Sequence, residues 1–167
     1  MAGFITHRII HHAKEIQMTW QLFDIEIIGN QSQVLLDDQY ISDTPGESLP
    51  NIAWFAVWCL QDTSGHYWNP EETDTLNKIE TDLLGLVAES GYGWAVYVRR
   101  VASAGMREYF IYYGGDAVLS EVVPALKALH PEYRIEFETK SDPEWKHYFQ
   151  WLKEAPQELA VQRSCLE

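Results

Sequence analysis

The chain has 167 residues, of which 46% are hydrophobic and 22% charged, as expected for a single globular domain with a sizeable core. Its 25 aspartates and glutamates outnumber its 12 lysines and arginines, which gives a formal net charge of -13. That charge would repel nucleic acid and anionic membranes, whereas it would attract a basic protein. Nucleic-acid binding and a membrane location are therefore not expected.

The two cysteines point to a reducing compartment. Cys59 lies in an apolar run and Cys165 lies near the C-terminus, which is not the pattern of a disulfide framework. The N-terminus lacks an apolar signal-peptide core, and the longest apolar run, residues 52–60, is too short to span a bilayer. We therefore expect a cytoplasmic protein.

Three regions are expected along the chain. Residues 1–17 would form an N-terminal extension, residues 18–156 a single α+β domain, and residues 157–167 a C-terminal tail. Met18 begins the first clearly patterned segment and could be the true start.

The first part of the domain shows strand periodicity. Apolar and charged residues alternate over residues 20–28, which predicts a half-buried strand, and Gly29-Asn30 predicts a turn. A second strand over residues 34–41 would complete an N-terminal β-hairpin. The continuous apolar run over residues 52–60 predicts a central strand.

The remaining elements follow in the order of a ferredoxin-like sandwich. A helix is expected from Asn69-Pro70 to Gly91, then a β-hairpin over residues 93–113, a helix over 116–129 and a strand over 133–138. Pro124 must either kink the second helix or mark a later start. From residue 52 onward the order is βαββαβ, with both helices covering one face of a four-stranded antiparallel sheet.

Uninterrupted alternation along the strands would divide their side chains between two faces. The side covered by the two helices would carry Tyr133, Ile135, Phe137, Val96, Val98 and Phe110. The opposite side would carry Tyr97, Arg99, Arg107, Tyr109, Tyr113, Arg134, Glu136 and Glu138. Rings interleaved with arginines on an open sheet are how ribonucleoprotein-type domains bind single strands, but their signature is absent here. The alternative is that the hairpin or the last helix covers this face.

Residues 141–152 predict a C-terminal capping helix. Pro143 fits the first helical position with Asp142 as the cap, and Ser141 with Glu144 offers an alternative capping box. One apolar stripe then contains Trp145, Tyr148, Phe149 and Leu152, which suggests a lid packed on the sheet. Trp151 lies off this stripe and is predicted to be the exposed aromatic residue.

Four segments also carry a resemblance to a known family. They are Met18-Thr-Trp20, Leu49-Pro50-Asn-Ile-Ala-Trp54, His130-Pro131-Glu-Tyr133-Arg-Ile-Glu136 and Asp142-Pro143-Glu-Trp145-Lys-His-Tyr148. Together they resemble DUF695, a bacterial family of unknown function, over most of residues 18–156. The family has no established catalytic residues, so the resemblance implies none here. The resemblance also implies a second module, similar to the regulator of ribonuclease E, but only in some longer members of the family.

No catalytic, metal-binding or cofactor-binding constellation is expected. His7, His11 and His12 are close together, but no cysteine or carboxylate spacing completes a metal site. Cys59 is expected to act as a small hydrophobic residue. Three carboxylate pairs, which would suit acid-base chemistry, are better explained as a solvated strand face, a bulge and a helix start: Asp24 with Glu26, Asp37 with Asp38, and Glu71 with Glu72.

Two functional hypotheses follow. The leading one is a non-enzymatic interaction or regulatory module that binds another protein, which could be basic. The alternative is a small enzyme or ligand-binding domain with a pocket between sheet and cap. The candidate binding residues are Trp54, Tyr97, Arg99, Arg107, Tyr109, Trp145 and Tyr148. The sequence leaves open a homo-oligomer formed through a face or edge of the sheet.

Overall fold

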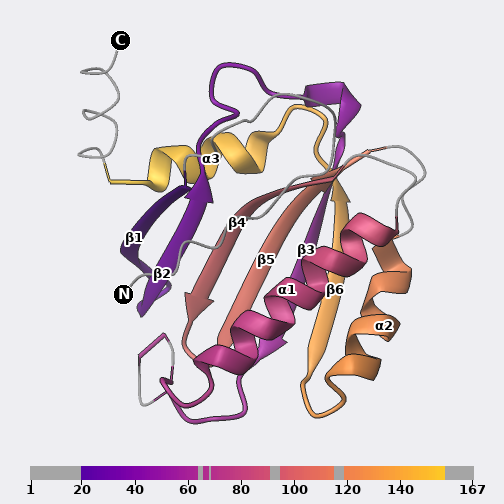
Figure 1. Cartoon of the computed structure of the whole chain (residues 1–167). Helices are drawn as coiled ribbons and strands as arrows, with labels where there is room; N and C mark the ends of the chain where they lie inside the picture. The colour runs from indigo at the N-terminus through magenta and orange to yellow at the C-terminus, as the bar shows by residue number, and fades with distance from the viewer. Residues whose placement is uncertain (1–19, 64–65, 68, 91–94, 115–118, 157–167) are drawn as a thin grey trace.

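A computed structural model describes residues 20–63, 66–67, 69–90, 95–114 and 119–156. It is an α+β structure with one six-stranded antiparallel sheet in the order β1-β2-β4-β5-β3-β6 (Figure 1). The strands are β1 Trp20–Ile27, β2 Asn30–Asp37, β3 Asn51–Trp58, β4 Ala95–Ser103, β5 Met106–Tyr113 and β6 Ile135–Ser141. The α-helices are α1 Thr73–Glu89, α2 Val122–Leu129 and α3 Lys146–Glu154, and the short 3-10 helices are η1 Gly46–Ser48 and η2 Leu119–Glu121.

Several sequence expectations concern residues outside these ranges. They are the extension over residues 1–17, with Met18 as a start, the tail over residues 157–167, Cys165, the three histidines of the extension, and Gly91 to Gly93.

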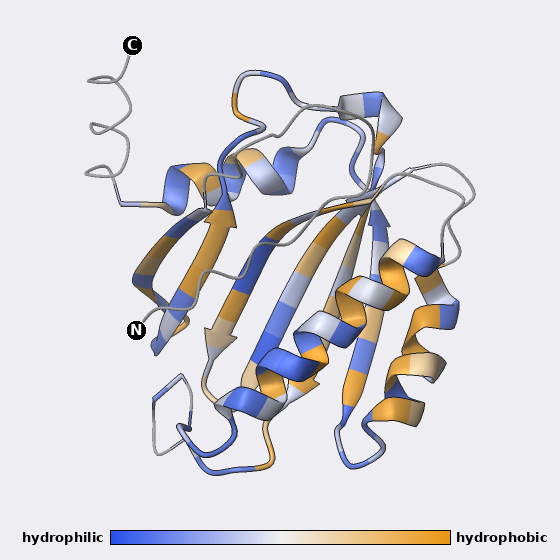
Figure 2. Ribbon diagram, in the orientation of Figure 1, coloured by the Kyte–Doolittle hydropathy of each residue, from blue (hydrophilic) through white to orange (hydrophobic). Residues whose placement is uncertain are grey.

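The sheet has a hydrophobic core on each of its two faces. On the first face, α1 and α2 pack over β3, β4, β5 and β6 (Figure 1). On the second face, α3 packs over β1, β2, β4 and the Tyr112 end of β5. The alternation of hydrophobic and hydrophilic residues along the strands is visible in Figure 2. The sheet is therefore the middle layer, and most of both its faces are covered.

The sheet is larger than the expected ferredoxin-like one. The order βαββαβ is present from β3 to β6, but β2 also pairs with β4, so the N-terminal hairpin extends the sheet to six strands. Val34 and Leu36 on β2 are buried in the second core, and this burial explains why the hairpin joins the sheet.

The N-terminal hairpin turns earlier than expected. Ile28 and Gly29 both have positive φ, 49° and 77°, and they connect the paired residues Ile27 and Asn30. Two positive φ values are typical of the two-residue turns that match the twist of a hairpin. As a result, β2 starts at Asn30 instead of residue 34.

The other elements lie close to their expected positions. Helix α1 and the β4–β5 hairpin are confirmed, although β4 contains a bulge between Tyr97 and Arg99. Pro124 lies in the first turn of α2, so it marks a late helix start and not a kink.

The start of α3 differs from the expectation in one respect. The helix begins at Lys146, so Pro143 is not its first residue. The carboxylate of Asp142 nevertheless accepts hydrogen bonds from the backbone amides of Lys146 and His147, at 2.9 and 3.1 Å. The prediction that Trp151 is exposed is wrong, because its ring packs 4.7 Å from that of Phe110 and is buried.

Candidate functional site

The seven candidate binding residues do not form one surface. Tyr97, Arg107 and Tyr109 lie on the first face of the sheet and are buried beneath α1. The Tyr97 hydroxyl donates to Glu80 at 2.9 Å, and Arg107 donates to Asn77 at 2.9 Å. Burial, followed by the negative charge of Glu80, raises the pKa of Tyr97 well above its ordinary value. All three side chains are thus enclosed between the sheet and α1.

Two physical features explain why their face differs from the expectation. The β4 bulge inverts the alternation, so Tyr97 faces α1 while Arg99 faces α3. In addition, α1 supplies the buried carboxylate of Glu80, which forms a 3.0 Å ion pair with Arg100. The Tyr97 hydroxyl and the Arg100 guanidinium can therefore both lie under the helix, because each is hydrogen-bonded to Glu80. Val96 and Val98, which were expected under the two helices, lie in the second core, and Phe110 packs against that core.

Arg99, Trp145 and Tyr148 lie together in the layer formed by α3. The guanidinium of Arg99 lies 4.6 Å from the ring of Trp151 and 3.8 Å from the Glu154 carboxylate, and burial lowers its pKa to about 10. Trp145 and Tyr148 are fully buried. The expected lid is thus part of the second core and covers the β1, β2 and β4 side of the second face.

Trp54 lies on the part of the second face where β3 and β6 are adjacent. Neither core includes it, and its side chain is only half-buried. Its indole N–H donates to the Glu108 carboxylate at 2.8 Å, which fixes the orientation of the ring. Glu138 is paired with Trp54 across the strands, and Glu136 is paired with Ala56. This part of the sheet therefore presents a fixed aromatic ring surrounded by carboxylates.

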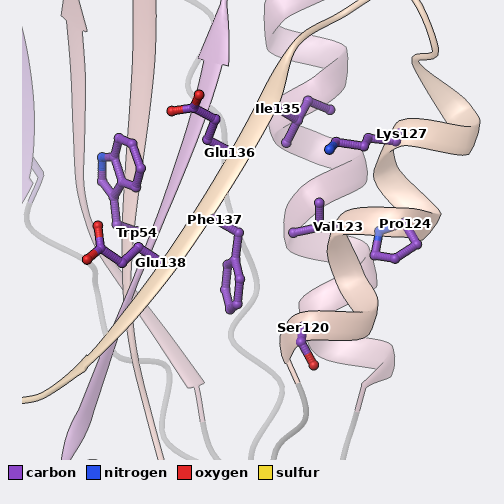
Figure 3. Close-up of a pocket in the computed structure, with 9 residues that line it drawn as sticks. All are labelled: Trp54, Ser120, Val123, Pro124, Lys127, Ile135, Glu136, Phe137 and Glu138. Atoms are coloured by element: carbon purple, nitrogen blue, oxygen red, sulfur yellow. The ribbon is translucent and has the colours of Figure 1, made fainter.

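A groove of about 600 Å³ follows the outer edge of β6 (Figure 3). Four consecutive residues of β6 line it, together with Trp54 on one side and four residues of η2 and α2 on the other. They are Ile135, Glu136, Phe137, Glu138, Trp54, Ser120, Val123, Pro124 and Lys127. Trp54, Glu136 and Glu138 lie on one side of β6, and Phe137 lies on the other, toward α2 (Figure 3). The groove therefore gives access to both sides of an edge strand.

The backbone of β6 leaves a row of groups free at this edge. The Trp58 amide donates to the Arg134 carbonyl at 3.0 Å, and the Asp142 amide donates to the Pro50 carbonyl at 2.7 Å. Because hydrogen-bonded pairs alternate along antiparallel strands, the even-numbered residues of β6 direct their backbone groups to β3. Ile135, Phe137 and Thr139 consequently direct their N–H and C=O groups outward, where no strand of the described chain pairs with them.

The two walls of the groove differ in charge and polarity. Glu136 and Glu138 are on the Trp54 side, where Arg134 is hydrogen-bonded to Glu136 and stacks on Trp58. No hydrogen bond or ion pair joins Glu138 to another residue that the structure describes. The opposite wall is formed by α2, which is mainly hydrophobic along its length (Figure 2) and contributes the cation of Lys127.

The described residues offer no comparable arrangement for catalysis. No group of three or more His, Cys, Asp or Glu side chains among them could hold a metal ion. Burial and the charge of Glu72 raise the pKa of the Cys59 thiol, which disfavours the thiolate. His147 donates a 2.9 Å hydrogen bond from Nδ1 to the Asp142 carboxylate, but Asp142 also caps α3 and binds the Tyr112 hydroxyl. This aspartate is best explained as structural.

The sequence alone points to Trp54, Glu136 and Glu138 but not to the α2 wall. Val123, Pro124 and Lys127 are expected from it only as helix residues. The signal that could have found them is that a mainly hydrophobic eight-residue helix precedes the last strand.

Comparison with known protein families identifies the family of this chain. A family model described as "Family of unknown function (DUF695)" matches residues 18–153. The chain belongs to this family. The DUF695 match includes every strand of the sheet, as well as α2 and the groove. No curated protein matches the chain.

A solved structure offers only a distant similarity. A hydantoinase/carbamoylase family amidase from Burkholderia ambifaria is 14% identical with a TM-score of 0.30. The match covers 54% of this chain and 27% of the amidase chain, and it carries no argument about activity. None of the described helices is long and apolar enough to cross a membrane.

Proposed function

We propose that this protein is a non-enzymatic, cytoplasmic interaction module that binds an extended segment of a partner protein along β6. The observation that carries the proposal is the outward row of backbone groups on β6 beside a groove. An extended peptide that adds to a sheet edge gains main-chain hydrogen bonds, and the grooves on either side accept its alternating side chains. The groove between β6 and α2 could accept side chains on one side of such an added strand.

The two edges of the sheet are not equivalent in this respect. The outer strand at the other end is β1, and the groove lies instead against β6. The β6 edge combines free backbone groups with an apolar wall from α2 and an aromatic, acidic surface at Trp54. This combination favours specific strand addition at β6.

Thr139→Pro tests the proposal directly. It removes an outward N–H of β6 without removing a hydrogen bond to β3, and proline is tolerated at such edge positions. Peptides selected from a displayed random library against the wild-type protein should bind at least tenfold more weakly to this variant, because a ladder hydrogen bond is lost and the proline ring obstructs pairing. Fluorescence polarisation with the selected peptides measures the change.

Thr139→Ala is the matched control, since it keeps the N–H and should keep the binding. Nuclear magnetic resonance (NMR) shift changes on peptide addition should centre on Ile135, Phe137 and Thr139. Selected peptides that bind both variants equally would contradict strand addition. A dimer of the protein that Thr139→Pro dissociates would assign the edge to a second copy and contradict a separate partner.

We further infer that β3 to β6 with α1 and α2 form a ferredoxin-like unit. The neighbour order β4-β5-β3-β6 and the position of both helices on one face support this assignment. The hairpin β1–β2 and helix α3 are then additions to that unit. A module similar to the regulator of ribonuclease E in longer family members stays a prediction.

A further inference from the structure

The side chains on β6 indicate which kind of segment would fit. An antiparallel or parallel strand added to β6 places its alternate side chains on the two sides of the sheet, in step with those of β6. The residue opposite Phe137 therefore points toward α2. Its two neighbours, opposite Glu136 and Glu138, point toward Trp54.

On the Trp54 side, the chemistry suits positively charged side chains. Glu136 and Glu138 would each lie directly across from one of these neighbours, and opposite charges in such cross-strand positions attract. The indole of Trp54, whose N–H is held by Glu108 at 2.8 Å, offers an aromatic face for a lysine or arginine. The whole chain, with a net charge of -13, also attracts a basic segment at long range.

On the α2 side, the chemistry suits an apolar side chain. Phe137 is held against Phe55 with ring centroids 4.8 Å apart, so it forms a fixed platform. Val123 and Pro124 form the apolar part of the facing wall, and Lys127 would repel a cation there. The two sides thus select opposite kinds of residue at alternating positions.

We propose that the partner segment is an extended basic-apolar-basic sequence, with lysine or arginine opposite Glu136 and Glu138 and an apolar residue opposite Phe137. This proposal rests on the proposed function, because it assumes strand addition to β6. It specifies the partner by the charge and register of the edge strand.

Capped synthetic peptides test the pattern. A Thr-Lys-Val-Lys-Thr peptide should bind at least tenfold more tightly than Thr-Glu-Val-Glu-Thr, because two attractive cross-strand pairs replace two repulsive ones. Binding of the basic peptide should weaken as salt is raised. NMR titration of the full chain measures both affinities and shows whether the β6 amides respond.

Charge reversal in the protein supplies the complementary test. The double variant Glu136→Lys with Glu138→Lys should weaken the basic peptide about tenfold and strengthen the acidic one. Of the single variants, Glu138→Lys should have the larger effect, since Glu136 is already hydrogen-bonded to Arg134. Glu136 is partly exposed and Glu138 is exposed, and circular dichroism checks that the variants fold.

The outcomes separate this inference from the proposed function. If library-selected peptides are sensitive to Thr139→Pro but show no basic-apolar-basic pattern, strand addition stands and the partner chemistry is wrong. Equal binding of the acidic and basic peptides would likewise contradict the partner chemistry alone. If no peptide of either kind binds in a manner sensitive to Thr139→Pro, both proposals fail.

Discussion

Replacement of Trp145 by alanine is expected to lower the free energy of unfolding by about 3–5 kcal/mol, as is typical of a large aromatic residue removed from a core. Trp145 is 0% exposed, and its ring stacks on that of Tyr112 with centroids 3.9 Å apart. Its indole N–H donates to the Leu49 carbonyl at 3.0 Å. The substitution removes the stack and leaves a buried carbonyl without its donor.

The backbone of Trp145 makes a second comparison informative. Its φ of 55° lies in the left-handed region, which costs a residue with a side chain roughly 1–2 kcal/mol. Trp145→Gly loses the same packing but relieves this strain. The glycine variant should therefore be more stable than the alanine variant, by about 1 kcal/mol, which reverses their usual order in helices.

Urea unfolding followed by far-ultraviolet circular dichroism measures both variants. Ile28→Gly is the matched control for backbone strain, because Ile28 has a φ of 49° and its side chain is 96% exposed. It should stabilise the protein, since strain is relieved and no packing is lost. An alanine variant within about 1 kcal/mol of the wild type would contradict the role given to Trp145 in the core.

These contacts also explain how α3 differs from a removable lid. The Tyr148 hydroxyl donates to the Asp37 carbonyl at 2.8 Å, so α3 is tied to the end of β2 as well as to β5 through Tyr112. A helix joined to the sheet by buried aromatic rings and hydrogen bonds is part of the core. The binding surface proposed at β6 therefore lies apart from α3.

Periodicity was sufficient to predict most elements because each has one buried side. It failed at β2, where the left-handed turn at Ile28-Gly29 moved the strand start to Asn30. It also failed for the faces of β4 and β5. A bulge between Tyr97 and Arg99 is invisible in an alternating pattern, and the buried Glu80 that accommodates Tyr97 comes from a distant helix. Such tertiary partners override the polarity of a single strand.

The candidate site could be predicted only in part for a similar reason. The order βαββαβ places the last strand at an edge of the sheet. The alternation of Glu136, Phe137 and Glu138 predicts which side chains lie on each face of that strand. The groove, however, depends on where α2 packs relative to that edge. The half-exposure of Trp54 likewise depends on how far α3 extends across the second face. Neither can be read from local sequence spacing.

Replacement of Asp37 by asparagine is expected to stabilise the protein near neutral pH. Asp37 is 0% exposed at the end of β2, and its carboxylate accepts a 3.0 Å hydrogen bond from the backbone amide of Gln39. Burial raises its pKa from 3.8 to about 6, in spite of the hydrogen bonds from Gln39. The folded state therefore binds a proton more tightly than the unfolded state.

The sign of the pH dependence follows from this raised pKa. The favourable contribution of protonated Asp37 is fully present below pH 3.8 and is lost as the pH rises through about 6. Asp142 acts in the opposite direction. Burial would raise its pKa, but hydrogen bonds from Tyr112 and His147 outweigh burial and lower it, so its contribution is lost as the pH falls below the ordinary carboxyl range. The difference between wild type and the Asp37→Asn variant isolates the first effect.

A pKa difference of about two units corresponds to roughly 3 kcal/mol at most, so a gain of about 1–3 kcal/mol is expected for Asp37→Asn near pH 7. The gain should shrink toward about pH 4, where Asp37 is already protonated in the folded state. Asparagine can still accept the hydrogen bond from the backbone amide of Gln39. Urea unfolding across this pH range measures the difference, with Asp24→Asn on the exposed side of β1 as the control. If Asp37→Asn is less stable than the wild type at pH 7, the ionised carboxylate stabilises the end of β2, and its hydrogen bonds outweigh the cost of burying its charge.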